Sequence, residues 1–134
     1  MKKLLLILAV FGLAACNGAR EPAQLDGQRA YFGFDSADIS AEAKDNLLGQ
    51  SLYMKRKPDT KIIIEGHCDE RGTSEYNLAL GSLRAGNAAH VLLKDGIEKE
   101  RIKTISYGKE KPQVLGTGEE VWSKNRNATT RVSE

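Results

Sequence analysis

The sequence predicts an α/β fold: a two-layer sandwich of order β-α-β-α-β-β, with two helices packed on one face of a mixed sheet. Short aromatic or β-branched runs alternate along the chain with two long helical patterns, and this alternation carries the prediction. A strand joined to a parallel strand through each helix would give right-handed crossovers. The 134 residues are enough for one domain with a modest core.

The first half of the domain is predicted as strand and helix. Residues 30–34 form a short aromatic run, which turn-forming residues follow. Ser40 is placed to cap a helix that runs to about Lys57, and Pro58 ends it. We expect the inward stripe of this helix to contain Ala43, Leu47, Leu48, Leu52 and Tyr53.

The second half repeats the pattern. Residues 61–65 are a β-branched run and predict a buried strand. A helix should follow from about Ser74 to just before Gly96, and residues 101–107 should form a third strand. The small and apolar positions of this helix are Leu78, Gly81, Ala85, Ala88 and Leu92. Residues 108–125 are predicted as a loop and residues 126–132 as a weakly apolar final strand.

The N-terminus is predicted as a targeting segment. Residues 1–15 combine two lysines with a short apolar run and end in small residues before Cys16, which resembles the bacterial lipobox. The prediction is a signal peptide over 1–15, a lipidated Cys16 with a short tether over 16–29, and a domain over 30–134. By the sorting rule for such proteins, Asn17 points to the outer membrane. The alternative is an ordinary secretory signal with an incidental cysteine.

Charge and cysteine content exclude several classes of protein. Of 20 basic residues, two precede the apolar run, which leaves 18 against 18 acidic residues. A neutral remainder with 6% aromatic residues lacks the clustered basic surface that binds nucleic acid. With Cys16 lipidated, Cys68 is the one remaining cysteine, so no disulfide within the chain is expected. We expect Cys68 to behave as a small apolar residue.

A polar turn over residues 66–73 joins the second predicted strand to the second helix. Ligands often bind at such a junction, because it opens at the carboxyl end of a strand and at a helix N-terminus. Asn77, Gly81 and Arg84 share one helix face. We expect Asp69 to accept an ammonium group and Arg84 to hold a carboxylate, so that a small zwitterion binds both. Alternatively, Asp69 and Arg84 pair with each other, or one caps the helix.

Catalytic and metal sites find little support in the sequence. His67, Cys68, Asp69 and Glu70 are metal ligands by type, but adjacent residues at a strand end alternate in direction and cannot all converge. The paired spacings of zinc sites do not occur, and no residue has the surroundings of a nucleophile elbow. We predict a binding protein with no cofactor, no metal and no catalytic residues. His67 is expected to be buried and His90 to lie on a helix surface.

Residues 31–126 resemble the OmpA-like peptidoglycan-binding domain, in particular that of the peptidoglycan-associated lipoprotein (Pal) family. The resemblance rests on the stretches 31–35, 66–81, 106–112 and 123–126. It implies the fold described above and non-covalent binding of the diaminopimelate of uncrosslinked peptidoglycan stems. The implied grips are Asp69 and Arg84, and the residues implied around them are Phe34, Asp35, Arg71, Thr73, Asn77 and Leu80.

The resemblance also implies a cellular role. It predicts a periplasmic domain anchored to the outer membrane, which it tethers to the cell wall in the Tol-Pal system during division. The implied protein partners are TolB and, as a second candidate, TolA. Two alternatives differ from this role: a periplasmic protein-interaction module with a decayed pocket, and a periplasmic amidase using His67, Asp69 and Glu70.

Overall fold

The computed structural model describes residues 18–133, so the predicted signal peptide and Cys16 lie outside the described residues. The elements occur in the order β1 (Arg29–Tyr31), α1 (Ala41–Arg56), β2 (Lys61–His67), α2 (Ser74–Lys94), a 3-10 turn (Lys99–Arg101), β3 (Ile102–Gly108), α3 (Glu119–Asn125) and β4 (Asn127–Ser133). None of the helices within 18–133 is long and apolar enough to cross a bilayer.

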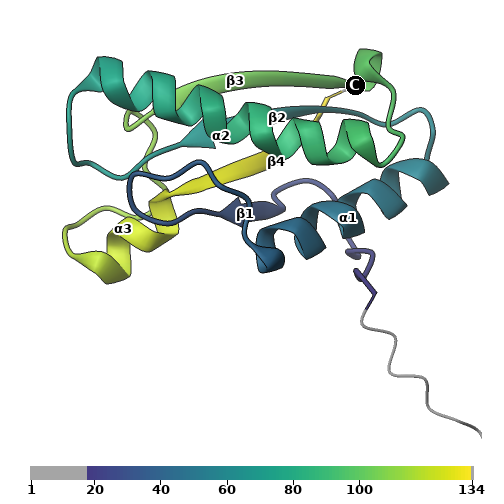
Figure 1. Cartoon of the computed structure of the whole chain (residues 1–134), viewed down its shortest axis with the longest axis horizontal. Helices are drawn as coiled ribbons and strands as arrows, with labels where there is room; N and C mark the ends of the chain where they lie inside the picture. Colours follow the sequence, from purple (N-terminus) through teal and green to yellow (C-terminus); the bar gives the residue numbers. More distant parts are fainter. Residues whose placement is uncertain (1–17, 134) are drawn as a thin grey trace, which may run out of the picture.

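The four strands form one mixed sheet of order β1-β4-β2-β3, and α1 and α2 cover one face of it (Figure 1). β2 pairs with β3 in parallel, and β4 runs antiparallel to both β1 and β2. The last strand therefore lies between the first two. The predicted two-layer α/β sandwich is confirmed, and it places the carboxyl ends of β1 and β2 at the same edge of the sheet.

The predicted helices are observed, and the cap expected at Ser40 is present. Ser40 accepts a hydrogen bond from the Ala43 N–H at the start of α1, and Thr73 caps α2 by accepting from the Tyr76 N–H. The apolar stripes are only partly as expected, since Leu52 and Leu78 are exposed. In α1, Gln50, Ser51 and Met54 instead point inward and are buried.

The strands differ from expectation at their ends. β1 spans three residues and stops at Tyr31, although the Phe32 N–H still donates to the Arg126 carbonyl in the register of the β1–β4 pair. β4 is fully formed although it is weakly apolar. Thr129 and Thr130 are buried in it, and their hydroxyls bond to Asn127 and Gln50. Paired polar side chains can fill a core at low cost, which the apolar pattern alone does not reveal.

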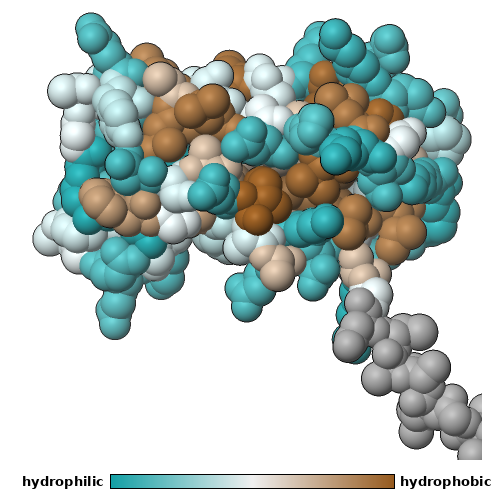
Figure 2. All heavy atoms as spheres, viewed as in Figure 1, coloured by the Kyte–Doolittle hydropathy of each residue, from teal (hydrophilic) through white to brown (hydrophobic). Residues whose placement is uncertain are grey.

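Two further segments differ from the sequence prediction. Residues 119–125, expected to be a loop, form the short helix α3. The predicted tether packs on the domain over most of its length: Leu25 is buried in the main core, and the Gly27 N–H donates to the Thr130 carbonyl at 2.8 Å. In Figure 2 the helix layer shows hydrophobic residues gathered between α1 and α2 and hydrophilic residues around them.

Two glycines set the distance between α2 and the sheet. A Cβ on Gly66 of β2 would overlap the Gly81 carbonyl oxygen of α2, and a Cβ on Gly81 would overlap the Ser106 hydroxyl. Gly81 allows a close backbone approach, and the approaching backbone is that of β2. This contact brings α2 against the end of β2, where the polar turn begins.

The Gly66–Gly81 contact predicts that Gly66→Ala lowers the free energy of unfolding by about 1–3 kcal/mol, because an added methyl forces α2 off the sheet. The matched control is Gly86→Ala on the same helix, where a Cβ meets open space. This control should raise stability by up to about 1 kcal/mol through helix propensity. Urea denaturation measures both. Equal stability of the two variants would contradict the close-packing account.

Candidate functional site

A pocket of about 260 Å³ opens at the sheet edge where β1 and β2 end and α2 begins. Three segments line it: the loop after β1, the turn after β2 and the first turns of α2. The lining residues are Phe34, Asp35, Cys68, Asp69, Arg71, Gly72, Tyr76, Asn77, Leu80 and Arg84. Asp69 and Arg84, expected to converge from the turn and the helix, therefore face one hollow.

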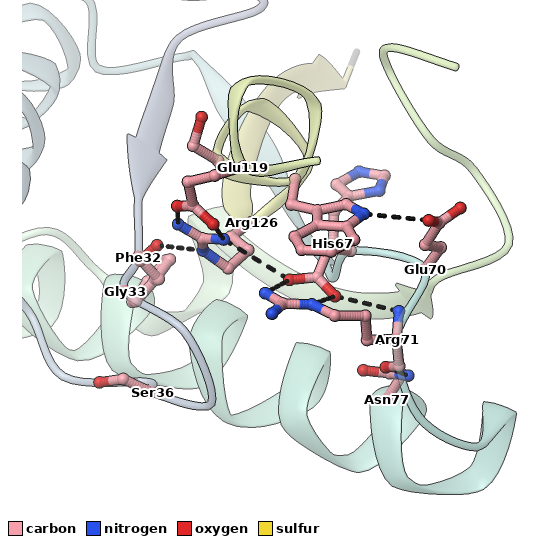
Figure 3. A network of polar contacts seen from close by, with 12 residues as sticks. Phe32, Gly33, Ser36, His67, Glu70, Arg71, Asn77, Glu119 and Arg126 are labelled. Atoms are coloured by element: carbon pink, nitrogen blue, oxygen red, sulfur yellow. Dashed lines mark hydrogen bonds and ion pairs between the residues drawn. The ribbon is translucent and has the colours of Figure 1, made fainter. Parts of the chain in front are cut away.

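The Asp69 carboxylate is buried and already paired within the protein. It accepts from the Arg71 backbone N–H at 3.0 Å and from the Arg71 guanidinium at 2.8 and 3.2 Å. Arg126 lies 3.6 Å away and is itself paired with Glu119 (Figure 3). Burial alone would raise the pKa of Asp69, but the hydrogen bonds and charge of Arg71, with the charge of Arg126, hold that pKa below its usual value.

The Arg71 guanidinium lies between two aromatic rings. Its central carbon is 4.1 Å from the Phe34 ring centroid and 4.0 Å from that of Trp122. The Trp122 indole N–H donates to Glu70 at 3.0 Å, which holds the ring in place. A cation between two aromatic faces is attracted to both. Arg71 is thus held beside Asp69 at the wall of the pocket, and α3 contributes to this arrangement through Trp122.

Arg84 is only 1% exposed and donates to three backbone carbonyls. Its Nε–H bonds to Ser36 at 2.8 Å, one Nη to His67 at 2.9 Å and the other Nη to Gly33 at 3.1 Å. A guanidinium has five N–H groups, and three of them make these bonds. The other two have no hydrogen-bond partner among the described residues. Burial lowers the pKa of Arg84, although a guanidinium stays charged at physiological pH.

Asp35 and Asn77 complete the polar lining. Asp35 has a left-handed backbone (φ 49°), which an aspartate tolerates, and its carboxylate accepts from the Tyr76 hydroxyl. That hydrogen bond raises the pKa of Tyr76. The Asn77 amide donates to the carbonyls of Arg71 and Thr73 at 2.8 and 3.0 Å, and so braces the turn (Figure 3).

The sequence predicted most of the lining but not all of it. Thr73, expected near the ligand, does not line the pocket, because its hydroxyl is used as the cap of α2. Tyr76 was missed, although it precedes Leu80 by four residues and Arg84 by eight, which places the three on neighbouring parts of the same helix face. Trp122 was missed because its contact with Arg71 joins distant parts of the chain.

The four adjacent residues from His67 to Glu70, at the end of β2, diverge as their alternation predicted. His67 is buried, stacks on Tyr107 and contacts Glu65 at 3.3 Å, while burial lowers its pKa. The Cys68 thiol donates to the Asn77 carbonyl at 3.2 Å, and burial raises the pKa of that thiol. Neither His67 nor Glu70 lines the pocket, so the grouping required by the amidase alternative is not present there.

Comparison with known proteins assigns the chain to a family. Residues 31–126 match the OmpA family. The peptidoglycan-associated lipoprotein of Pasteurella multocida is 41% identical, over 96% of this chain and 97% of the relative. That of Agrobacterium fabrum is 44% identical, over 89% of this chain and 70% of the relative.

Comparison with solved structures supports the same family assignment. The crystal structure of the peptidoglycan-associated lipoprotein from Burkholderia pseudomallei is similar with a TM-score of 0.76 and 40% identity, over 79% of this chain and 90% of that one. The C-terminal domain of Helicobacter pylori MotB shares the fold, with a TM-score of 0.73 at 18% identity over 79% of this chain and 84% of that one. By sequence and by fold, the chain belongs to the OmpA family, in which its curated relatives are peptidoglycan-associated lipoproteins.

Proposed function

We propose that this protein binds peptidoglycan non-covalently, by holding the free end of a diaminopimelate side chain in the pocket at the end of β2. The observation that carries the proposal is that Asp69 and Arg84 line the same small hollow. Diaminopimelate carries an ammonium and a carboxylate on one carbon. A site with an anionic and a cationic wall recognises both groups at once, and a neutral or singly charged ligand leaves one wall unpaired.

The remaining hydrogen-bonding capacity suits such a ligand. A carboxylate has about four acceptor sites, and Asp69 uses three on Arg71, so one is left for an ammonium. Arg84 keeps two N–H groups for a carboxylate beyond those bonded to backbone carbonyls. Asp35 and the Arg71 guanidinium offer a further charge of each sign. Phe34, Asn77 and Leu80 complete the wall, and Thr73 acts through the helix cap.

The proposed cellular role follows from wall binding combined with a lipid anchor. Acylation of Cys16 would hold the domain at the outer membrane, and the pocket would attach it to the wall in the periplasm. In this role the protein tethers the two layers without catalysis. It works with TolB, and with TolA as a second candidate, in envelope integrity and division. A fragment-sized ligand binds weakly at one site, but many anchored copies beside one polymer compensate through multivalency.

Arg84→Lys should weaken binding of the mature lipoprotein to purified sacculi about tenfold or more, because a single ammonium cannot reproduce the donor fork. Arg131→Lys is the matched control, since Arg131 is partly exposed on β4 and does not line the pocket. Free diaminopimelate should compete with wild-type binding. Sacculus pull-down below both melting temperatures provides the measurement, and equal binding of the two variants would contradict the proposal.

Asp69→Asn keeps the side-chain shape and removes the charge, so it should also weaken sacculus binding. Asp95→Asn is the control, because Asp95 pairs with Lys55 at the far end of α2. Should Asp69→Asn fail to fold, Asp35→Asn offers an exposed alternative on the same pocket. Binding at the wild-type level by folded Asp69→Asn and Asp35→Asn together would exclude the proposed ammonium site.

The lowered pKa of Asp69 predicts a pH-dependent stability. A carboxyl whose folded pKa lies below its unfolded value contributes stability above about pH 4, and the contribution is lost as pH falls through the folded pKa. Wild type should therefore exceed Asp69→Asn in unfolding free energy at neutral pH, and the difference should vanish in acid. Urea titrations over this range measure it. A difference that persists unchanged in acid would show that Asp69 acts without its charge.

A further inference from the structure

The segment that follows Cys16 is docked on the domain almost from its start. The Arg20 carbonyl lies so close to α1 that a Cβ on Gly49 would overlap it, and Pro22 packs at the same place. Glu21 forms an ion pair with Arg56, whose Nε–H donates to it at 2.7 Å. With Leu25 in the core, the chain from Arg20 onward is part of the folded domain.

Very little free chain then separates the domain from the proposed anchor. Three residues lie between Cys16 and Arg20. Four steps along a fully extended chain reach at most about 14 Å. The parts of the domain next to Arg20 must therefore lie near the headgroups of the membrane that holds the acyl chains.

The residues next to Arg20 suit an anionic lipid surface. Arg56 and Lys57 lie over the Tyr53 ring, at 5.7 and 4.9 Å from its centroid, and Lys57 donates to the Tyr53 hydroxyl at 3.1 Å. Tyrosine with lysine and arginine is typical of the bilayer interface, where aromatic rings sit at headgroup level and cations meet phosphates. We name Arg20, Tyr53, Arg56 and Lys57 the anchor-end surface.

The acidic groups near the anchor-end surface are few and mostly paired. Glu21 is bonded to Arg56, and Asp95 is bonded to Lys55 at 3.1 Å. Glu98 is bonded at 3.1 Å to Arg101, which also donates to the Lys57 carbonyl. Asp59 is exposed in the turn after α1. Arg20 and Lys57 have no ion-pair partner among the described residues. The surface thus keeps a positive excess that anionic headgroups attract within a Debye length.

The pocket lies at the other end of the sheet. β2 starts just after α1 ends and reaches the pocket seven residues later, which is about 20 Å of strand. Figure 1 shows the first described residues leaving beside α1, on the side of the molecule opposite to α3. An anchor-end surface on the membrane therefore turns the pocket away from it.

We propose that the anchor-end surface binds anionic phospholipid headgroups and so fixes the orientation of the domain, with the pocket directed away from the membrane. This rests on the lipidation of Cys16 in the proposed function, but not on what the pocket binds. The domain then keeps one orientation relative to the membrane, in contrast to a domain that rotates freely on a long flexible linker.

Quenching by brominated lipids tests the orientation, because Trp122 is the only tryptophan and lies at the pocket end. The mature lipoprotein is reconstituted in brominated phosphatidylethanolamine–phosphatidylglycerol vesicles. A Tyr53→Trp/Trp122→Phe variant is compared with wild type. Since headgroup attraction acts only at short range, quenching at position 53 should exceed that at Trp122 by about twofold or more.

Charge reversal supplies the matched controls. Arg20→Glu/Lys57→Glu leaves the Glu21–Arg56 pair intact and should reduce quenching at position 53 to its level in neutral phosphatidylcholine vesicles. Lys111→Glu/Lys124→Glu makes the same change of charge away from this surface and should have no effect. Equal quenching at positions 53 and 122, equal effects of the two pairs, or a mature chain without acyl groups on Cys16 by mass spectrometry would overturn the proposal.

Sacculus binding separates this proposal from wall binding. Arg20→Glu/Lys57→Glu in detergent should bind sacculi as wild type does, since it leaves the pocket unchanged. A protein with wild-type charges that binds sacculi but shows no excess quenching at position 53 over Trp122 overturns the orientation alone. The reverse result, quenching intact in a wild-type protein that binds no sacculi, supports the orientation and counts against wall binding.

Discussion

The buried guanidinium of Arg84 holds together three segments, of which the loop after β1 is far from the other two in the sequence. Its donors reach the carbonyls of Gly33 and Ser36 in the loop after β1, and that of His67 at the end of β2, while its backbone belongs to α2. A buried charge destabilises the fold unless it is hydrogen-bonded, so α2 and this loop must keep their positions relative to each other. The pocket depends on this arrangement, because α2 and the loop after β1 both line it.

The same constraint is compatible with a structural role and with the proposed ligand-binding role of Arg84. Its bonds to carbonyls are structural, and the two N–H groups that they leave can serve a ligand. Asp69 is comparable: it is held by Arg71 and neighbours Arg126, yet it still borders the hollow. For Asp69 and Arg84, a structural role and a ligand-binding role therefore do not exclude each other. Both side chains are held by the fold without a ligand, and in the proposed binding mode this lowers the ordering cost of binding.

Most of the fold could be predicted from the sequence, because it depends on local signals. Ser40 caps a helix where its hydroxyl indicated a start, and the β-branched run before Gly66 is a strand. β4 was harder, because its core side chains are threonine and asparagine that bond to Gln50 and to one another. Such pairing depends on residues about 80 positions away and leaves no apolar period to detect.

The site was predictable to the extent that it depends on one turn and one helix. Asp69, Asn77 and Arg84 follow from the strand–turn–helix junction and the helical period. The stacking of Arg71 between Phe34 and Trp122 does not, since it joins the loop after β1 with α3, a helix that was expected to be a loop. The packing of Arg20 against Gly49 likewise could not be predicted, because nothing in the spacing of these residues indicates it.

The most direct test of the central claim is a crystal structure of the domain with a muramyl tripeptide that ends in diaminopimelate. We expect the free ammonium within hydrogen-bond distance of Asp69 and the carboxylate on the Nη atoms of Arg84, in the pocket that Phe34 and Leu80 border. A ligand bound elsewhere, or bound there without contact to either side chain, would contradict it.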